Sequence, residues 1–203
     1  MWTAKNFKPK HPIKPTTANN AFAYWGMSAV FANERIDFRK ACSLDTSNCG
    51  NMSNMFYNNS IITEVGVIDT QKASNLQNAF ATCRALETIE KIILKTDGSQ
   101  IFTTTFDRCE SLKNIVFEGV IGNDINFQWS TKLTRASIEG IVNHLSDNGS
   151  GKTLTLSRTA VDEAFRGISS ADFTTIVPGS SSLDWYNLSH DATVYKHWTI
   201  TLV

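Results

Sequence analysis

The run Gly149-Ser-Gly-Lys-Thr153 is the part of the sequence that comes closest to a catalytic motif. A glycine-rich loop followed by lysine holds nucleotide phosphates when backbone N–H groups, the lysine and a helix N-terminus converge on the anion. That motif also requires a glycine where Ser146 stands, a strand before the loop and a helix after it. Here the apolar pattern predicts a helix before the run and a strand after it. The sequence therefore predicts a polar turn and no bound nucleotide.

Four cysteines and four histidines are the other residues that could supply nucleophiles or metal ligands. They form no Cys-x-x-Cys, His-x-His or His-Glu-x-x-His pattern, so neither a zinc site nor a disulfide framework is predicted. Cys83 and Cys109 fall at equivalent points of a repeat and are expected to be buried and inert, whereas Cys42 and Cys49 are expected to be the exposed thiols. His144 is expected to face solvent or to cap a helix. A Cys–His pair brought together by folding stays open, but no catalytic residue, metal or cofactor is predicted.

Charge and hydropathy exclude several broad classes of function. The 19 basic and 19 acidic residues give a formal net charge of zero, whereas nucleic-acid-binding proteins usually carry a basic excess. No apolar stretch approaches the ~18 residues that cross a bilayer, so membrane insertion is not expected. No apolar run follows the N-terminal lysines, so no signal peptide is expected. We expect the chain to stay in its cell, to leave inside a particle released by lysis, or to be part of a longer protein.

The first 19 residues are predicted to be an extended basic arm or linker, followed by a single solenoid domain at 20–203. Prolines at three positions discourage helix there: Pro9, Pro12 and Pro15. The basic residues of the arm are Lys5, Lys8, Lys10, His11 and Lys14. The arm is either solvated, docked on a neighbouring subunit or parent domain, or attracted to a phosphate-rich surface.

Three segments align without gaps and give the strongest signal in the chain. They run from Met52 to Val65, from Leu76 to Ile89 and from Phe102 to Ile115. Each reads as an apolar residue, three residues, phenylalanine, two residues, Cys or Asn, two residues, Leu or Ile, two residues, and Ile or Val. The period is 24 and then 26 residues, within the range of leucine-rich repeats, and is measured between Phe56, Phe80 and Phe106.

The spacing within each repeat predicts a helical turn followed by a short strand. The first three shared positions lie at i, i+4 and i+7, which is one face of a short helix. Val65 and Val67, like Ile115 and Phe117, alternate as inward-facing strand residues do. One such unit cannot bury its apolar face alone, so neighbouring units must stack around a continuous core. The predicted fold is α/β: a short leucine-rich-repeat solenoid with core repeats at 44–119 and α/β capping units at 120–203.

The capping units have their own pattern of elements. Apolar spacing predicts a helix over 133–145, a strand over 153–157, a helix over 160–166, a further helix from Ser180 and a last strand over 198–203. An array of stacked repeats needs such terminal units because its last apolar face would otherwise meet solvent.

The residues LDTSNCGNMSNMFYNNS at 44–60 and IDTQKASNLQNAFATCRALETI at 68–89 resemble the BspA-like leucine-rich-repeat family of bacterial surface proteins. The resemblance covers residues 44–119. A partial earlier copy begins at Asn20 and departs from the pattern at Trp25. The C-terminal segments are similar to those of BspA-like proteins encoded in gut-bacterial prophages, which tend to accompany virion or tail genes. The resemblance therefore implies a repeat solenoid carried by a virion or a cell surface.

Strand residues that alternate with core positions should form an outward ladder, the face that solenoid partners commonly use. The same rule assigns residues from the first and third repeat strands and from the first capping strand to one continuous face; the second repeat is less regular, and there Glu90 is expected to face outward while the direction of Lys91 stays open. The predicted face consists of Glu64, Gly66, Ile68, Glu90, Asn114, Val116, Glu118, Thr153, Thr155 and Ser157.

These features predict a non-catalytic recognition or structural module, first of all a virion or tail-associated protein that attaches to a host surface. The alternative is a fragment of a bacterial cell-surface adhesion protein, whose gene would encode a secretion signal and further repeats upstream. A surface-glycan hydrolase is less expected, because the repeats offer no cluster of carboxylates and no Ser-His-Asp group. The expected partners are a protein or a cell-surface glycan, with a homo-oligomer or a larger virion assembly as alternatives.

Overall fold

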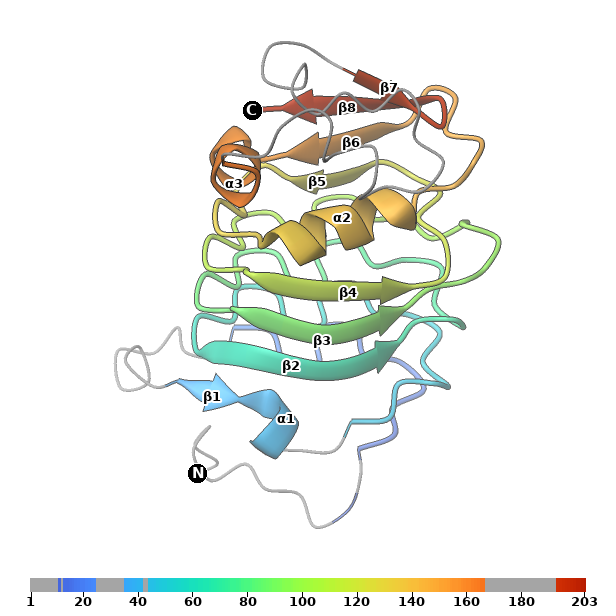
Figure 1. Cartoon of the computed structure of the whole chain (residues 1–203). Coiled ribbons are helices and arrows are strands. Elements are labelled where there is room, and N and C mark those ends of the chain that lie inside the picture. Colours follow the sequence, from blue (N-terminus) through green and yellow to red (C-terminus); the bar gives the residue numbers. More distant parts are fainter. Residues whose placement is uncertain (1–10, 12, 25–34, 42–43, 167–192) are drawn as a thin grey trace.

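The computed structural model describes residues 11, 13–24, 35–41, 44–166 and 193–203, and these form a parallel β-solenoid of about four turns (Figure 1). In each coil the chain passes through a strand on one side and returns through turns on the other. The expectation of a solenoid is confirmed.

Two sheets contain all the strands of the described residues. The first sheet is parallel and follows chain order, with β1 (Ile36–Asp37), β2 (Ile62–Asp69), β3 (Thr88–Ile93) and β4 (Asn114–Glu118). The second has the order β5 (Ile125–Phe127), β6 (Thr153–Leu156), β8 (Trp198–Leu202) and β7 (Thr193–Tyr195), and only β7 is antiparallel. The helices of the described residues are α1 (Phe38–Ala41), α2 (Arg135–Asn143) and α3 (Arg158–Ala164).

The segment of each coil that was predicted to be helical is instead a series of tight turns. Asn54 and Asn58 have positive φ angles, 56° and 54°, in the left-handed region. The Tyr57 N–H donates to the Asn54 carbonyl three residues earlier, at 3.1 Å, as in a β-turn. The Phe56 N–H instead donates to the Ala79 carbonyl of the next coil, at 2.7 Å. The prediction of a helical turn in each repeat is therefore wrong.

The left-handed residues explain why the helix does not form. A residue with positive φ cannot continue a right-handed helix, and asparagine tolerates this region better than most residues. The turns direct every second N–H along the solenoid axis, where the neighbouring coil accepts it, so these buried donors are satisfied. Positive φ recurs at the matching places of the following coils, at Asn78, Thr82, Thr104 and Arg108.

A column of stacked phenylalanines forms the centre of the core. Adjacent ring centroids are 4.7–5.8 Å apart with interplanar angles of 3–17°. The column contains Phe22, Phe56, Phe80, Phe106 and Phe127, one from each successive coil. The repeat period that the sequence shows is thus the length of chain that returns each phenylalanine to the same column.

A second column lies three residues after the phenylalanines and ties the coils together by hydrogen bonds. The Asn59 amide donates to the Phe22 carbonyl at 3.0 Å, and its oxygen accepts from the backbone N–H groups of Ile61 and Ile62. The thiol of Cys83 occupies the same slot in the next coil, and Asn59 and Cys83 are both fully buried. The polar groups of Asn59 and Cys83 are therefore paired, whereas the buried hydroxyl of Ser130, three residues after Phe127, has no hydrogen-bond partner among the described residues.

The first described coil includes residues that the sequence assigned to an extended arm. Ile13 bridges to Leu44, and the Ala18 N–H donates to the Asn51 carbonyl at 2.8 Å. Ala18 is 1% exposed, and Lys14 pairs with Asp45 at 3.0 Å. The boundary predicted at residue 19 therefore falls inside a coil, while residues 1–10 lie outside the described part of the chain.

The solenoid changes after β4, where the two sides of the coil exchange their types of element. Phe127 of β5 continues the column of phenylalanines, so the second sheet lies on the side that the turns occupy in earlier coils. On the strand side, α2 takes the place of a further strand beside β4. Its Ser137 hydroxyl donates to the Lys113 carbonyl at 3.1 Å and accepts from the Ile115 N–H at 3.0 Å. Figure 1 shows β6 and β8 running in the opposite direction to β2–β4.

Most of the elements predicted after residue 120 are present. The helix over 133–145 corresponds to α2, the strand over 153–157 to β6, the helix over 160–166 to α3 and the last strand to β8. Thr134 caps α2, where its side chain accepts from the Ser137 N–H. The helix predicted from Ser180 lies outside the described residues.

Candidate functional site

The exposed side of β2, β3 and β4 is the candidate ligand face. In β4 the alternation is regular: Ile115 and Phe117 are buried, and Asn114, Val116 and Glu118 are exposed as predicted. Parallel neighbours hold these rows in register from strand to strand. The face is therefore a rigid surface on which side chains from three coils lie side by side.

One predicted residue of this face points the other way. Ile68 is 2% exposed, and Val67 beside it is 42% exposed, so the predicted directions of both residues are wrong. The cause is a bulge: Ile89 and Ile92 of β3 pair with Ile115 and Phe117, so two intervening residues of β3 oppose one of β4. Because β2 keeps register with β3, it shares the extra residue. A bulge inserts one residue and shifts the period-2 alternation beyond it.

Ion pairs across the coils partly neutralise the carboxylates of the face. Arg39 of α1 pairs with Glu64 and, at 3.1 Å, with Asp37. Lys91 Nζ lies 2.9 Å from Glu118 Oε2. All these side chains are at least partly exposed, so the pairs shape the face more than they stabilise the fold. The candidate ligand face therefore carries both positive and negative charges and is not uniformly acidic.

Gly66 forms the floor of a hollow on this face. The pocket has a volume of about 210 Å³ and lies between α1 and the middle of β2 and β3. A Cβ added at Gly66 would lie 3.5 Å from Arg39 Cγ and 3.8 Å from Glu90 Oε2, so a guanidinium stem and a carboxylate flank the missing side chain. A positive and a negative side chain beside backbone that is not covered by a side chain suit a ligand with both hydrogen-bond donors and acceptors. The fold therefore brings the predicted residues Gly66 and Glu90 into one concave site, and the mostly buried Ile68 also lines it.

Three predicted residues do not belong to this face. Thr153 and Thr155 lie on β6, in the second sheet, where both are half-buried. Ser157 is 2% exposed and precedes α3 as its N-cap residue. Their assignment to one continuous ladder is wrong, because after β4 the strands continue on the turn side of the coil.

The glycine-rich run at 149–153 has a structural role. The space at Gly149 is filled by the indole of Trp198, which a Cβ at this position would overlap. Trp198 is fully buried, and its Nε1–H donates to the Ser146 carbonyl at 3.0 Å. The Lys152 amino group donates to the Asn123 side chain at 2.9 Å. The loop therefore joins α2 to β6 and packs on β8, as the prediction of a helix-to-strand turn requires.

The cysteines of the described coils are positioned for packing. Desolvation raises the pKa of Cys83 to about 12 and that of Cys109 well above its usual value, so both thiols stay protonated. Cys49 was expected to be exposed, but it is fully buried, and desolvation raises its pKa as well. Its Sγ donates to the Asn51 carbonyl at 3.3 Å. Cys42 lies outside the described residues.

His144 occupies the C-cap of α2, in line with the capping role expected for it. Its Nδ1 lies 2.7 Å from the Gly140 carbonyl oxygen, and its own backbone N–H bonds to the last turn. Among the residues that the structure describes, no group of three or more His, Cys, Asp or Glu side chains could hold a metal ion. In the same residues, no helix has both the length and the apolar character needed to cross a bilayer.

Sequence reasoning missed two parts of the hollow. Arg39 reaches Gly66 from the preceding coil, 27 positions earlier in the chain, and no local pattern signals that approach. Val67 was assigned to the core because it alternates with Val65. The one available signal was Gly66 itself, since a glycine inside a strand often marks a bulge or a close approach of another chain segment.

Comparisons with protein-family models, curated proteins and solved structures find no match to this chain.

Proposed function

We propose that this chain is a non-catalytic recognition module of the BspA-like leucine-rich-repeat type that attaches a virion or phage tail to a bacterial host surface. Its partner is a protein or glycan of that surface. The proposal starts from the repeats at 44–119, whose sequence resembles that family, and from a solenoid that presents one flat strand face. In this proposal the units at 120–203 cap the array.

The observation that carries the proposal is the composition of the β2–β4 face around Gly66. Val67 and Val116 are 42% and 49% exposed, although neither helps to form the core. Val67 pairs with Lys91 across β2 and β3, and Val116 follows in the next strand. Single exposed aliphatic side chains are ordinary. Here Val67 lines the hollow and Val116 lies two strands away on the same sheet, with charged side chains of β3 between them, a combination suited to a polar ligand with apolar patches.

The test measures binding of labelled protein to a panel of gut-bacterial strains, before and after enzymatic removal of surface glycans. We expect saturable, strain-specific binding that Val116→Glu abolishes, because a buried unpaired charge opposes complex formation. Ile101→Glu is the matched control: Ile101 is also an exposed aliphatic residue, at 47%, but it lies outside β2–β4. Loss of binding after glycan removal identifies a sugar as the ligand, and its persistence identifies a protein.

Three outcomes contradict the proposal. The first is the absence of binding to every strain in the panel while the protein is folded and monomeric by sedimentation. The second is binding that Val116→Glu and Ile101→Glu weaken equally, because the β2–β4 face would then have no special part in recognition. The third is the formation of oligomers that Val116→Glu dissociates, because the face would then be a subunit interface rather than a surface for host recognition.

A further inference from the structure

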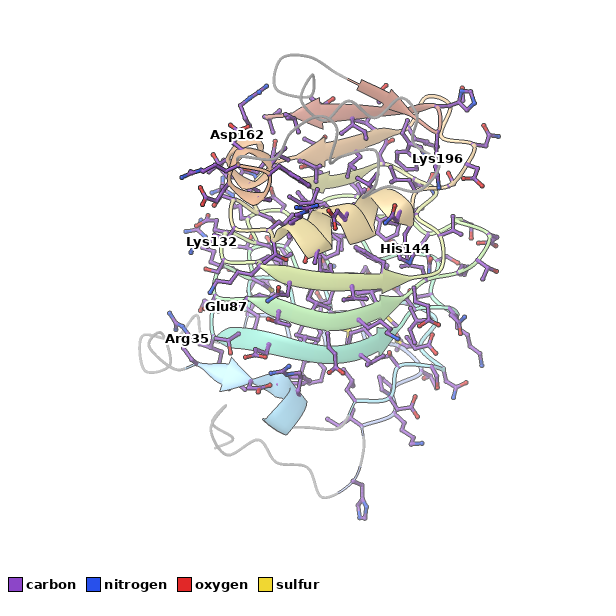
Figure 2. All side chains as sticks on the ribbon, in the orientation of Figure 1. Arg35, Glu87, Lys132, His144, Asp162 and Lys196 are labelled. Atoms are coloured by element: carbon purple, nitrogen blue, oxygen red, sulfur yellow. The ribbon has the colours of Figure 1, made fainter. Side chains whose placement is uncertain are left out.

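A second, larger hollow lies at the edge of the solenoid where the strands of the first sheet begin. It has a volume of about 430 Å³ and spans four coils, with lining residues that include Arg35, Ser60, Thr63, Arg84, Glu87 and Ser111. Figure 2 shows Arg35 and Glu87 along this edge, with Lys132 further along it. The hollow at Gly66 shares none of these lining residues, so the two are separate sites. We refer to it as the edge groove.

Positive charge predominates around the edge groove. Arg84 contacts Glu110 through Nε at 3.5 Å, and Lys113 Nζ lies 2.7 Å from Glu87 Oε2. Lys113 and, more weakly, Lys132 lower the pKa of Glu87, which is therefore ionised at neutral pH. The lining of the groove therefore contains two cations, Arg35 and Arg84, and one carboxylate, Glu87. An anionic group is thus favoured at the arginine end of the groove, and a neutral donor at the Glu87 end.

Arginine is suited to a planar anion. A guanidinium carries five N–H donors in a fixed fork that matches the two oxygens of a carboxylate, and a single contact through Nε leaves donors for a ligand. The side chain of Arg84 is 53% exposed, so a ligand can reach it without unfolding of the coil. Ala85, also in the lining, has only a methyl side chain beside Arg84.

Hydroxyl groups line the rest of the groove. The Thr63 hydroxyl donates to the Ile36 carbonyl at 3.2 Å, so towards a ligand its oxygen can only accept. Ser60 and Ser111 add two hydroxyls that can donate or accept. Glu87 accepts hydrogen bonds from ligand hydroxyls when it is ionised. A polyol that carries one carboxylate matches this arrangement. Its hydroxyls can donate to the acceptors along the groove, and its carboxylate can accept from the guanidinium of Arg84.

We propose that the edge groove binds an acidic sugar, a saccharide unit with one carboxylate, with the carboxylate on Arg84 and the sugar hydroxyls on Thr63, Ser60 and Glu87. The groove volume falls within the range of small-molecule sites, ~300–1,000 Å³, and exceeds what a lone inorganic anion fills. The nearby Glu87 carboxylate also repels a doubly charged phosphate more than a singly charged sugar. The inference rests on the proposed recognition function only for the biological source of the sugar. The expected binding of an acidic sugar follows from the residues of the groove and does not depend on that function.

The experiment is calorimetric titration of the full chain with glucuronic, galacturonic and N-acetylneuraminic acids, beside glucose, N-acetylglucosamine, acetate and inorganic phosphate. We expect at least one acidic sugar to bind more tightly than every neutral sugar and both simple anions. Arg84→Gln should weaken that binding about tenfold or more, as expected for loss of a charge-assisted pair. Arg166→Gln is the matched control, because the Arg166 side chain is 75% exposed on the surface beyond α3 and, within the part of the chain that the structure describes, forms an ion pair with the nearby Glu163. Ala85→Gln, which fills the groove without changing its charge, should also weaken binding.

Each other result overturns the proposal. Equal affinity for neutral and acidic sugars removes the role of the carboxylate, and tighter binding of phosphate or acetate identifies a plain anion site. Acidic-sugar binding that survives both Arg84→Gln and Ala85→Gln lies elsewhere on the chain. If no sugar binds at millimolar concentration while labelled protein still binds cells through the β2–β4 face, the edge-groove inference fails and the recognition function stands.

Discussion

The thiol of Cys109 donates a hydrogen bond to the Phe80 carbonyl oxygen of the preceding coil, 3.2 Å away. One coil earlier, the Cys83 thiol bonds to the Phe56 carbonyl at 3.0 Å, and Asn59 repeats the contact through its amide. The carbonyls of Phe22, Phe56 and Phe80 are therefore each linked to the next coil by a small buried donor. This explains why Cys and Asn exchange at this buried position.

Replacement of Cys109 by alanine should destabilise the protein. The change removes the thiol donor to Phe80 and leaves a small void in a fully buried slot, and we expect a loss of about 1–3 kcal/mol in the free energy of unfolding. Cys109→Ser keeps a donor and should lose less. Urea unfolding followed by circular dichroism measures both variants, and an equal loss in the two would show that the hydrogen bond contributes nothing.

Stability should fall at high pH because the buried thiols resist ionisation. In the unfolded chain a cysteine loses its proton near its ordinary pKa of 9.0, whereas folded Cys83 keeps it up to a pKa of about 12. The folded state thus holds more protons between these values, and stability declines as pH rises from 9 towards 12, by about 1.4 kcal/mol per pH unit for each such thiol. Below pH 9 these thiols should cause no change.

The comparison variant for the pH experiment is Cys83→Ala/Cys109→Ala. Tyrosines and lysines titrate in the same range, so only the difference in slope between this variant and the parent reports the thiols. A variant slope as steep as that of the parent would show that the thiols do not cause the decline.

Thr82→Asn should stabilise the fold. Thr82 has a φ of 63°, and a β-branched side chain is strained in the left-handed region, whereas the matching residue of the previous coil is Asn58, with a φ of 54°. We expect a gain of about 0.5–1 kcal/mol, measured as a higher midpoint of thermal or urea unfolding. Asn58→Thr is the reverse exchange and should lower the midpoint. A lower midpoint for Thr82→Asn would mean that the threonine makes a contact worth more than its strain.

Gly149→Ala and Gly140→Ala should have opposite effects. At Gly149 a methyl group overlaps the buried Trp198 ring, so the loop or the indole must move, at a cost of about 1–3 kcal/mol. At Gly140, within α2, no atom outside the helix lies within 4 Å of the new Cβ, and alanine should stabilise the helix by about 1 kcal/mol. Urea midpoints give both values, and Trp fluorescence reports any displacement of the Trp198 ring. A neutral Gly149→Ala would contradict the close packing of this loop.

The repeat at 44–119 allowed much of the fold to be predicted, because its apolar positions recur after one full coil of chain. The period places Phe56, Phe80 and Phe106 in one column, and the spacing of branched residues predicts the strands and the buried Cys slot. After residue 120, α2, α3, β6 and β8 were predictable for the same reason, since each has a clear period of its own, whereas the short strands β5 and β7 were not predicted. The exposed residues of β4 followed from alternation alone.

The nature of the return segment was decided by the tertiary structure. An i, i+4, i+7 pattern fits a helix, but it fits equally well a series of turns that buries the same residues. The choice depends on where the backbone N–H groups find acceptors, and here the Phe56 N–H finds the carbonyl of Ala79 in the next coil. No local sequence pattern reports that partner, because it lies 23 residues away.

The candidate site was likewise predicted in part from the sequence and decided in part by the tertiary structure. Sequence alternation by itself identified Glu64, Gly66 and Glu90 as outward residues of neighbouring strands, because side chains in a strand alternate and coils stack in register. Only the tertiary structure placed Ile68 in the core through a bulge, moved Thr153 and Thr155 to a second sheet, and brought Arg39 against Gly66. Bulges, changes of side and contacts between coils depend on hydrogen bonds to distant segments, and the order of residues within one segment does not specify those partners.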